Sequence, residues 1–381
     1  MNNLFCNVCG NTLIEKIYEA PVGKSLTSLC IKSGHPTDVY FCHICEHVQT
    51  AEYINESEYY DFAYNILTDS DDEDQIYVVN DGQRIYRTDH QVKTLISKIE
   101  FFNGIQILDF GCAKSSTMAK LLQSHKGIEV FLYDVSSNYL PFWEKFLDPA
   151  NWAVYTIPDA WHGKFDVVTS FFSLEHISNL RDVVIKIKTV LKKGGTFYAV
   201  VPNFLTNNAD MIVVDHPNHF TELSLEHLLR THGFKIENID IESHRGALVI
   251  TAKLDQQESE ITNKQKLYQK AIEISNFWSA SSKKINDFES KNFGLSSAIY
   301  GAGFYGAFLA ANISNLRSVK HIIDQNPFLH GHTFFDLTVI PPDKLPDDIE
   351  VVYVGLNPAY AISIIEAIPS FAGRELKFFY L

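Results

Sequence analysis

The stretch that decides the fold is Ile107-Leu108-Asp109-Phe110-Gly111-Cys112-Ala113-Lys114-Ser115. Apolar residues that run into a glycine indicate a strand that ends in a tight loop, and a helix is predicted to follow at 117–124. A second strand, 129–133, ends at Asp134. A carboxylate at the end of the second strand is placed to accept both ribose hydroxyls of an adenosine. Gly111 allows the backbone to approach such a ligand closely.

The loop itself narrows the choice of ligand. Phosphate-binding loops need G-x-G-x-x-G, but only Gly111 is a glycine in the present loop. One glycine suits S-adenosylmethionine, which has no phosphate, better than a dinucleotide. Asp109, Gly111, Cys112 and Asp134 are therefore the candidate cofactor residues, although Asp109 could be a cap and Cys112 a small buried side chain.

The residues around this stretch alternate between strand and helix patterns. Strands are predicted at 105–110, 165–171, 196–201, 235–242 and 247–253, and helices at 83–102, 180–191 and 225–232. This alternation predicts a doubly wound α/β domain over 59–255, with its core at 83–253.

Four short segments add an ordered pattern: Phe165-Asp166-Val167-Val168, Leu174-Glu175-His176-Ile177, Leu191-Lys192-Lys193-Gly194-Gly195 and Val201-Pro202-Asn203. Together with the loop described above, they resemble class I S-adenosylmethionine-dependent methyltransferases. The resemblance places Phe172 and Ser173 at the cofactor. It places Glu175 and His176 at the mouth of the site, where they would shape the substrate pocket.

Two Cys-x-x-Cys pairs mark a separate module over residues 1–58. Cys6 and Cys9 form the first pair, and Cys42 and Cys45 the second. Paired knuckles of this kind are typical of a tetrahedral structural zinc site, which supports folding rather than catalysis. Cys30, His43 or His47 could replace one ligand.

The C-terminal part is predicted to be a smaller α/β domain, 291–381, that follows a helical connector at 256–290. Gly301, Gly303 and Gly306 lie between a strand and a helix, and Asp324 ends the next strand. This pattern fits a dinucleotide fingerprint, which makes NAD a possible ligand. The unit is short for a full dinucleotide fold, so these four residues are instead candidate substrate-binding residues, whose loop could cradle a diphosphate at the helix N-terminus. A tight turn without a ligand is the alternative.

Composition excludes several classes of protein. The 381 residues include 46 acidic and 32 basic side chains, so no basic face for nucleic acid is expected. The apolar runs are too short to span a membrane. The first residues lack a basic region followed by an apolar core, which favours a cytoplasmic location.

The whole chain resembles bacterial deoxysugar C-methyltransferases, which act on nucleotide-linked 4-keto sugars. The residues that carry the resemblance are 219–224, 228–234 and 244–248, together with 300–303 and 324–327. The resemblance implies a zinc module, a methyltransferase domain and a C-terminal domain that closes over the nucleotide part of the substrate. Where that family has Tyr-His-Glu-His, this chain has His216-Pro217-Asn218-His219.

Methylation at carbon needs a base that removes a proton next to a ketone. His219 is the candidate base, and the alternative is a structural histidine that is hydrogen-bonded near the start of the following helix. Asn218 and Tyr64 are candidate donors to the developing oxyanion, and His216 is the candidate replacement for the missing glutamate. The alternatives are methylation of oxygen or nitrogen on a sugar or another metabolite, and, third, an NAD-dependent oxidoreductase.

Overall fold

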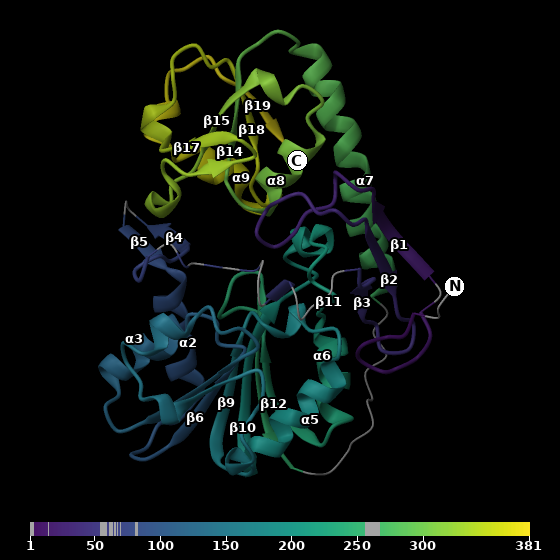
Figure 1. Cartoon of the computed structure of the whole chain (residues 1–381). Coiled ribbons are helices and arrows are strands. Elements are labelled where there is room, and N and C mark those ends of the chain that lie inside the picture. Colours follow the sequence, from purple (N-terminus) through teal and green to yellow (C-terminus); the bar gives the residue numbers. More distant parts are fainter. Residues whose placement is uncertain are drawn as a thin grey trace. The chain divides into compact units, whose positions relative to one another are not determined.

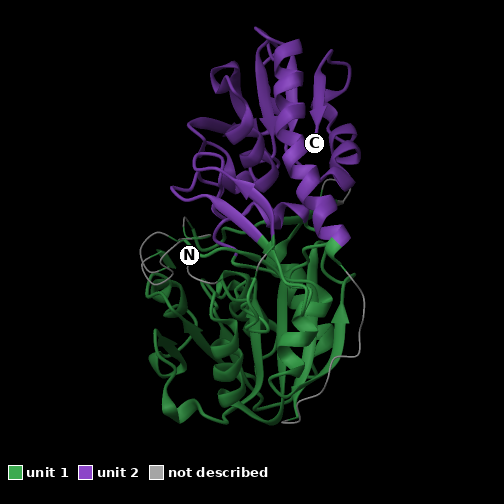
Figure 2. Cartoon of the chain, turned by 90° about the vertical axis from the view of Figure 1, so that its right-hand side faces the viewer, with its two compact units in different colours: residues 1–15, 40–207, 217–268 green, residues 16–39, 208–216, 269–381 purple. Residues whose placement is uncertain are grey.

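The computed structural model describes residues 4–13, 15–53, 59, 60, 64, 66, 68, 70–80, 83–255 and 267–381. The chain divides into two compact units (Figure 2). Unit 1 contains residues 1–15, 40–207 and 217–268, and unit 2 contains 16–39, 208–216 and 269–381. This division joins parts that the four predicted segments keep apart. The predicted boundary at 58/59 and the start of the connector, 256–266, lie outside the described residues.

A seven-stranded sheet forms the centre of unit 1 (Figure 1), in the order β12-β13-β10-β9-β6-β7-β8. Neighbouring strands run parallel from β10 to β8, whereas β13 is antiparallel to both β10 and β12. The bounds are β6 (Gln106–Phe110), β7 (Glu129–Asp134), β8 (Trp152–Val154), β9 (Phe165–Phe171), β10 (Leu191–Pro202), β12 (Phe234–Asp240) and β13 (Ala247–Leu254). The predicted α/β fold class is therefore confirmed.

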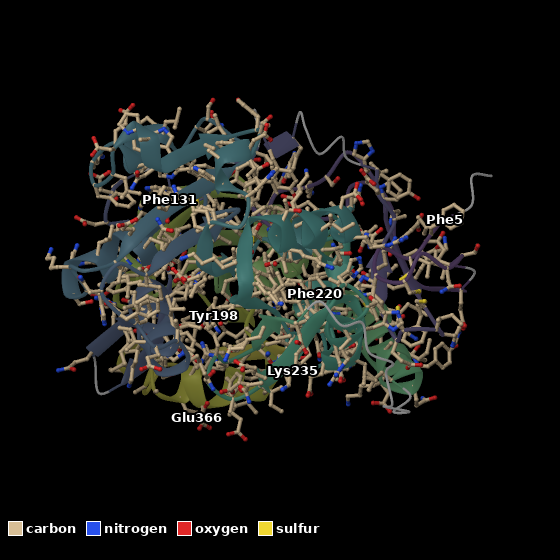
Figure 3. The ribbon with its side chains drawn as sticks, turned by 90° about the horizontal axis from the view of Figure 1, so that it is seen from below. Phe5, Phe131, Tyr198, Phe220, Lys235 and Glu366 are labelled. Carbon is tan, nitrogen blue, oxygen red and sulfur yellow. The ribbon has the colours of Figure 1, made fainter. Side chains whose placement is uncertain are left out.

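Alternate residues of each strand enter two different cores. Leu108 packs in the core that includes α5 (Leu180–Val190) and α6 (Glu222–Arg230). Its neighbour Ile107 packs in the core that includes α2 (Arg87–Lys98) and α3 (Ser116–Ser124). Figure 3 labels Phe131 and Tyr198, which belong to opposite cores, and the exposed Lys235. Helices on both faces explain why the central strands are nearly all apolar.

Smaller elements complete unit 1. The predicted helix at 83–102 is wrong at its start, because β5 (Gln83–Tyr86) pairs with β4 (Ile76–Asn80) as a hairpin. Cross-strand pairing here overrides the helical spacing further along. The short helices are α4 (Leu140–Trp143), η2 (Pro149–Asn151), η3 (Asp159–Trp161) and η4 (Leu174–His176).

A short antiparallel pair joins β3 (Val48–Thr50) to β11 (Asn218–His219), with His219 opposite Val48. The helix α6 begins directly after this pair. Thr221 caps it: its hydroxyl accepts from the Ser224 backbone N–H, and the Ser224 hydroxyl accepts from the Thr221 backbone N–H. Thr221 and Ser224 thus form a capping box at the start of α6.

Unit 2 has a six-stranded sheet in the order β16-β17-β15-β14-β18-β19. All neighbours are parallel except β16 and β17, so five parallel strands are present. The parallel sheet of unit 2 is thus larger than the short length of this part of the sequence suggested. Its strands are β14 (Ser297–Tyr300), β15 (Val319–Ile323), β16 (Thr333–Phe334), β17 (Leu337–Ile340), β18 (Val351–Val354) and β19 (Lys377–Tyr380).

The helices associated with this unit are α7 (Tyr268–Lys291), α8 (Phe304–Asn312) and α9 (Pro358–Glu366). Its single-turn helices are η5 (Asn208–Ile212), η6 (Leu316–Ser318), η7 (Pro327–Leu329), η8 (Pro342–Lys344) and η9 (Pro369–Phe371). The strands β1 (Glu15–Ala20) and β2 (Thr37–Phe41) fall largely within its N-terminal segment. Within the described ranges, every helix is too short or too polar to cross a bilayer.

Candidate functional site

The loop after β6 is held by a buried carboxylate. One oxygen of Asp109 accepts from the Ser115 hydroxyl at 2.8 Å, and the other accepts from the Thr169 hydroxyl at 2.9 Å. Burial raises the pKa of Asp109 to about 6. Through these two hydrogen bonds, Asp109 positions the loop and ties β6 to β9.

Asp134 lies where the sequence places it, as the last residue of β7. One carboxylate oxygen accepts from the Ala113 backbone N–H at 2.7 Å, and the other from the Ser136 backbone N–H at 3.1 Å. Burial raises the pKa of Asp134 to about 6. The carboxylate therefore stands between the loop after β6 and the loop after β7, the position that a ribose-binding acid needs.

The loops after β6 and β9 touch each other. Gly111 has a φ of +66°, and a Cβ atom at this position would lie 2.0 Å from the Ser173 hydroxyl oxygen. Phe172, just before Ser173, also has a positive φ of 50°. Cys112 is buried in the core, which agrees with the alternative that it is a small buried side chain. Left-handed residues in two facing loops indicate a backbone shaped for a ligand.

An aromatic cluster lies at η4, the short helix that begins directly after Ser173. His176 in η4 places Nδ1 3.0 Å from the Tyr60 hydroxyl, and its ring centroid is 5.3 Å from that of Tyr64. Glu175, beside it, is almost fully buried. The structure thus brings together Tyr64, Glu175 and His176, which the sequence assigns to one site.

The predicted base, His219, is fully buried in β11. Its Nε2 lies 2.7 Å from the Thr50 hydroxyl, and its ring centroid is 6.1 Å from that of Phe204. For His219 to remove a proton from a substrate, the substrate would have to reach the imidazole ring inside the protein.

Asn218 requires a correction. Its side-chain amide donates to the carbonyls of Leu174 at 3.1 Å and Ile177 at 2.7 Å. Its oxygen accepts from the Asn7 amide at 2.9 Å and lies 3.3 Å from His47 Nε2. Both amide protons are used inside the protein, so the predicted donation to an oxyanion is wrong for this geometry. Asn218 instead connects the first Cys-x-x-Cys turn to the ends of η4.

His216 belongs to unit 2, where its Nδ1 lies 2.7 Å from a carboxylate oxygen of the buried Asp210. Its ring meets Phe304, the first residue of α8, at 6.2 Å between centroids. An aspartate that holds one imidazole nitrogen fixes the tautomer of the ring.

The glycine loop of unit 2 packs backbone against backbone. A Cβ on Gly306 would lie 1.9 Å from the Gly301 carbonyl oxygen, whereas a Cβ on Gly303 would meet no atom within 4 Å. Gly301 has a φ of +101°. Asp324 accepts from the backbone N–H groups of Ala302 at 2.9 Å and Asn326 at 2.8 Å.

The four predicted zinc ligands converge. The sulfur atoms of Cys6 and Cys45 are 3.5 Å apart, as are those of Cys9 and Cys42, and all four lie within 4.8 Å of one another. Sulfur atoms about 3.8 Å apart are expected around a tetrahedral zinc with Zn–S bonds of about 2.3 Å. The four thiolates therefore fit a zinc ion, and Cys30, His43 and His47 are outside the set.

The two knuckles have the same backbone form. The N–H of Gly10 donates to the Cys6 carbonyl at 2.8 Å, and the N–H of Glu46 donates to the Cys42 carbonyl at 2.9 Å. Gly10 and Glu46 have φ values of +73° and +57°. Each knuckle thus turns back through a left-handed residue directly after its second cysteine.

Sequence reasoning missed Arg87, which begins α2 and lies over the ring of Phe172, with 5.2 Å from its guanidinium carbon to the ring centroid. It also assigned no role to His244, whose ring contacts the same Phe172. The two residues are far apart in the chain, and no short motif connects them.

Residues 82–239 match a family model described as "Methyltransferase domain". The strand order around Asp109 and Asp134 is that of a class I Rossmann-like methyltransferase fold. Residues 82–239 therefore form a domain of the methyltransferase type.

Solved structures are similar to this chain at low identity. An S-adenosylmethionine-dependent methyltransferase from Mesorhizobium loti is 16% identical, with a TM-score of 0.35, and the match covers 43% of this chain and 97% of that one. A putative S-adenosylmethionine-dependent methyltransferase from Listeria monocytogenes is 16% identical, with a TM-score of 0.35, over 45% and 98% of the chains. The CurJ carbon methyltransferase is 16% identical, with a TM-score of 0.34, over 43% and 52%. No curated protein matches this chain.

Proposed function

We propose that this enzyme transfers the methyl group of S-adenosylmethionine to a carbon atom of a nucleotide-linked 4-keto sugar. The observation that carries the proposal is the cluster of Tyr60, Tyr64 and His176. It follows directly on the loop at Ser173, which touches the cofactor loop at Gly111. The resemblance along the whole chain supports the sugar as substrate.

The residues of unit 1 have separate roles in this proposal. Asp134 binds the ribose of the cofactor, while Gly111, Phe172 and Ser173 shape the loops around it. S-adenosylmethionine supplies the methyl group at a sulfonium, whose leaving group is already good, so the protein must align the acceptor and activate it. A zinc ion on Cys6, Cys9, Cys42 and Cys45 would hold the fold and take no part in the reaction.

Activation of a carbon next to a ketone needs a base and a donor to the enolate oxygen. We assign the base to His176, because its Nδ1 shares a hydrogen bond with the Tyr60 hydroxyl and so has a partner that can relay a proton. Tyr64 is the donor to the enolate oxygen. His219, the base that the sequence suggests, is the competing assignment, and it must act from a fully buried position.

The test uses methyl-labelled S-adenosylmethionine and a panel of nucleotide-linked 4-keto sugars in D2O. We expect a new methyl group on carbon, together with deuterium exchange at that carbon. His176→Asn should abolish both, whereas His219→Asn should retain exchange. If exchange survives in His176→Asn and is lost in His219→Asn, the base is His219. A methyl group on oxygen or nitrogen overturns the proposal in favour of the alternative class of methyltransferase.

A further inference from the structure

His244 is a buried imidazole in the loop between β12 and β13. Only 4% of its surface is exposed. Its ring meets three others edge to face, with centroid distances of 5.1 Å to Tyr77, 5.2 Å to His90 and 5.3 Å to Phe172. Phe172 is the residue that follows β9, so His244 lies against the loop that we assign to the methyl donor.

One nitrogen of this ring has a definite role and the other does not. Nδ1 lies 3.4 Å from the Arg245 carbonyl oxygen, which can only accept, so Nδ1 carries the proton. Nε2 is then an acceptor. It is buried and has no hydrogen-bond partner within the described part of the chain. Burial, followed by the charges of His90 and Arg87, lowers the pKa of His244 to about 3, so the ring is neutral near pH 7.

Arg87 contacts the same aromatic ring. Its guanidinium carbon is 5.2 Å from the centroid of Phe172, and the side chain is partly exposed. Among the described residues, none accepts a hydrogen bond from the Arg87 guanidinium or forms an ion pair with it. Burial lowers the pKa of Arg87, and the nearby charges of Asp74, Tyr64 and Glu175 oppose this shift, so the guanidinium lies within electrostatic range of the proposed active-site cluster. A guanidinium offers five N–H donors in a planar fork.

The N–H donors of Arg87 and the unused acceptor of His244 therefore both lie beside the ring of Phe172. The adenosine end of the cofactor is assigned to β6 and β7, where Asp109 and Asp134 lie. His244 instead precedes β13, which pairs with β10 on the other side of β9. We therefore take this part of the sheet edge as the side of the methyl acceptor.

We propose that Arg87 and His244 select a methyl acceptor that carries a hydroxyl group beside its carbonyl group. The Arg87 guanidinium donates to the carbonyl oxygen, and the acceptor's hydroxyl donates to His244 Nε2. The inference rests on the proposed function only in taking this edge of the sheet as the acceptor side. It adds a specificity that the methyltransferase fold does not set, because a buried acceptor left without a donor discriminates against ligands that lack the hydroxyl.

The test is a binding measurement on the full chain saturated with S-adenosylhomocysteine. Histidine side chains are labelled with 15N, and the probes are 2-hydroxycyclohexanone and cyclohexanone. We expect the hydroxyketone to shift the His244 Nε2 resonance upfield and to bind about tenfold or more tightly than the ketone. The resonances of the exposed His162 are the internal reference and should not move.

Two variants separate recognition from packing. His244→Phe keeps an aromatic ring against Phe172 and should bring the two probes to equal affinity. Arg87→Met should weaken both probes, because the carbonyl contact is common to them. Equal binding of the two probes to the unmodified chain, or no response of Nε2, overturns the proposal without any variant having to fold.

The two proposals can fail separately. If the hydroxyketone engages His244 but no nucleotide-linked 4-keto sugar is methylated, the selection of a hydroxy-carbonyl group stands and the sugar substrate is wrong. If the sugars are methylated equally well with and without the neighbouring hydroxyl, the proposed function stands and this inference is wrong.

Discussion

Asn218→Ala tests whether the zinc module supports the active site. The side chain of this buried residue makes four hydrogen bonds, to Asn7, His47, Leu174 and Ile177, of which those to His47 and Leu174 are fully buried. At a net value of about 1 kcal/mol for each bond, the variant should lose about 4 kcal/mol of unfolding free energy. That is a large part of the stability of an ordinary domain, which is about 5–15 kcal/mol.

The loss should also reach the reaction, because η4 would no longer be held at both of its ends. We expect methyl transfer to fall by more than the affinity for S-adenosylmethionine, since His176 lies in η4 and Asp134 does not. Urea denaturation followed by tryptophan fluorescence gives the stability, and calorimetry gives the cofactor affinity.

Asn179→Ala is the matched control. Asn179 lies close to η4, but its amide donates to an exposed Asp182, so its loss should cost about 0.5 kcal/mol or less. If Asn218→Ala costs less than about 1 kcal/mol and transfers methyl groups at the normal rate, the module does not act through this side chain.

Three further outcomes follow from the site. Because the pKa of Asp134 is raised to about 6 and the ionised carboxylate accepts ribose hydroxyls more strongly than the protonated acid does, cofactor affinity should fall as the pH drops through 6; calorimetry from pH 5 to 7.5 measures this, and Asp134→Asn should bind weakly without that step. Gly111→Ala should lower cofactor affinity at least about tenfold, because its Cβ would meet a side chain at 2.0 Å, whereas Gly163→Ala, with a similar φ and no atom within 4 Å, should leave affinity unchanged. Elemental analysis should find one zinc per chain and none after Cys42→Ser, while Cys30→Ser should retain the metal; equal zinc in both variants would remove Cys42 from the ligand set.

The features that the sequence predicts well are those set by local spacing. The strand at Phe165–Phe171 has the predicted bounds, because a run of apolar residues needs no distant partner to be recognised. The Cys-x-x-Cys turns bring their own sulfur atoms together, and only the meeting of the two turns is long-range. The hairpin at 76–86 shows the limit, because its second strand continues directly into a helix with strong periodicity.

The candidate site could be predicted only in part. Asp134 follows from its place at a strand end. The clamp by Asn218 could not be foreseen, because its partners are 41 to 211 residues away in the chain. Arg87 and His244 are far apart in the chain and both contact Phe172, a meeting that no local spacing predicts.

The packing of Gly301 and Gly306 bears on how the C-terminal glycine pattern should be interpreted. Gly355, after β18, lies against Gly306, and a Cβ on it would be 2.5 Å from the Gly306 Cα. Selection for folding alone would therefore keep all three positions as glycine in related chains, with or without a nucleotide. Of the glycines in the fingerprint, Gly303 has open space around it. Whether related chains keep glycine at position 303 would therefore indicate a bound ligand, whereas the presence of the whole motif would not.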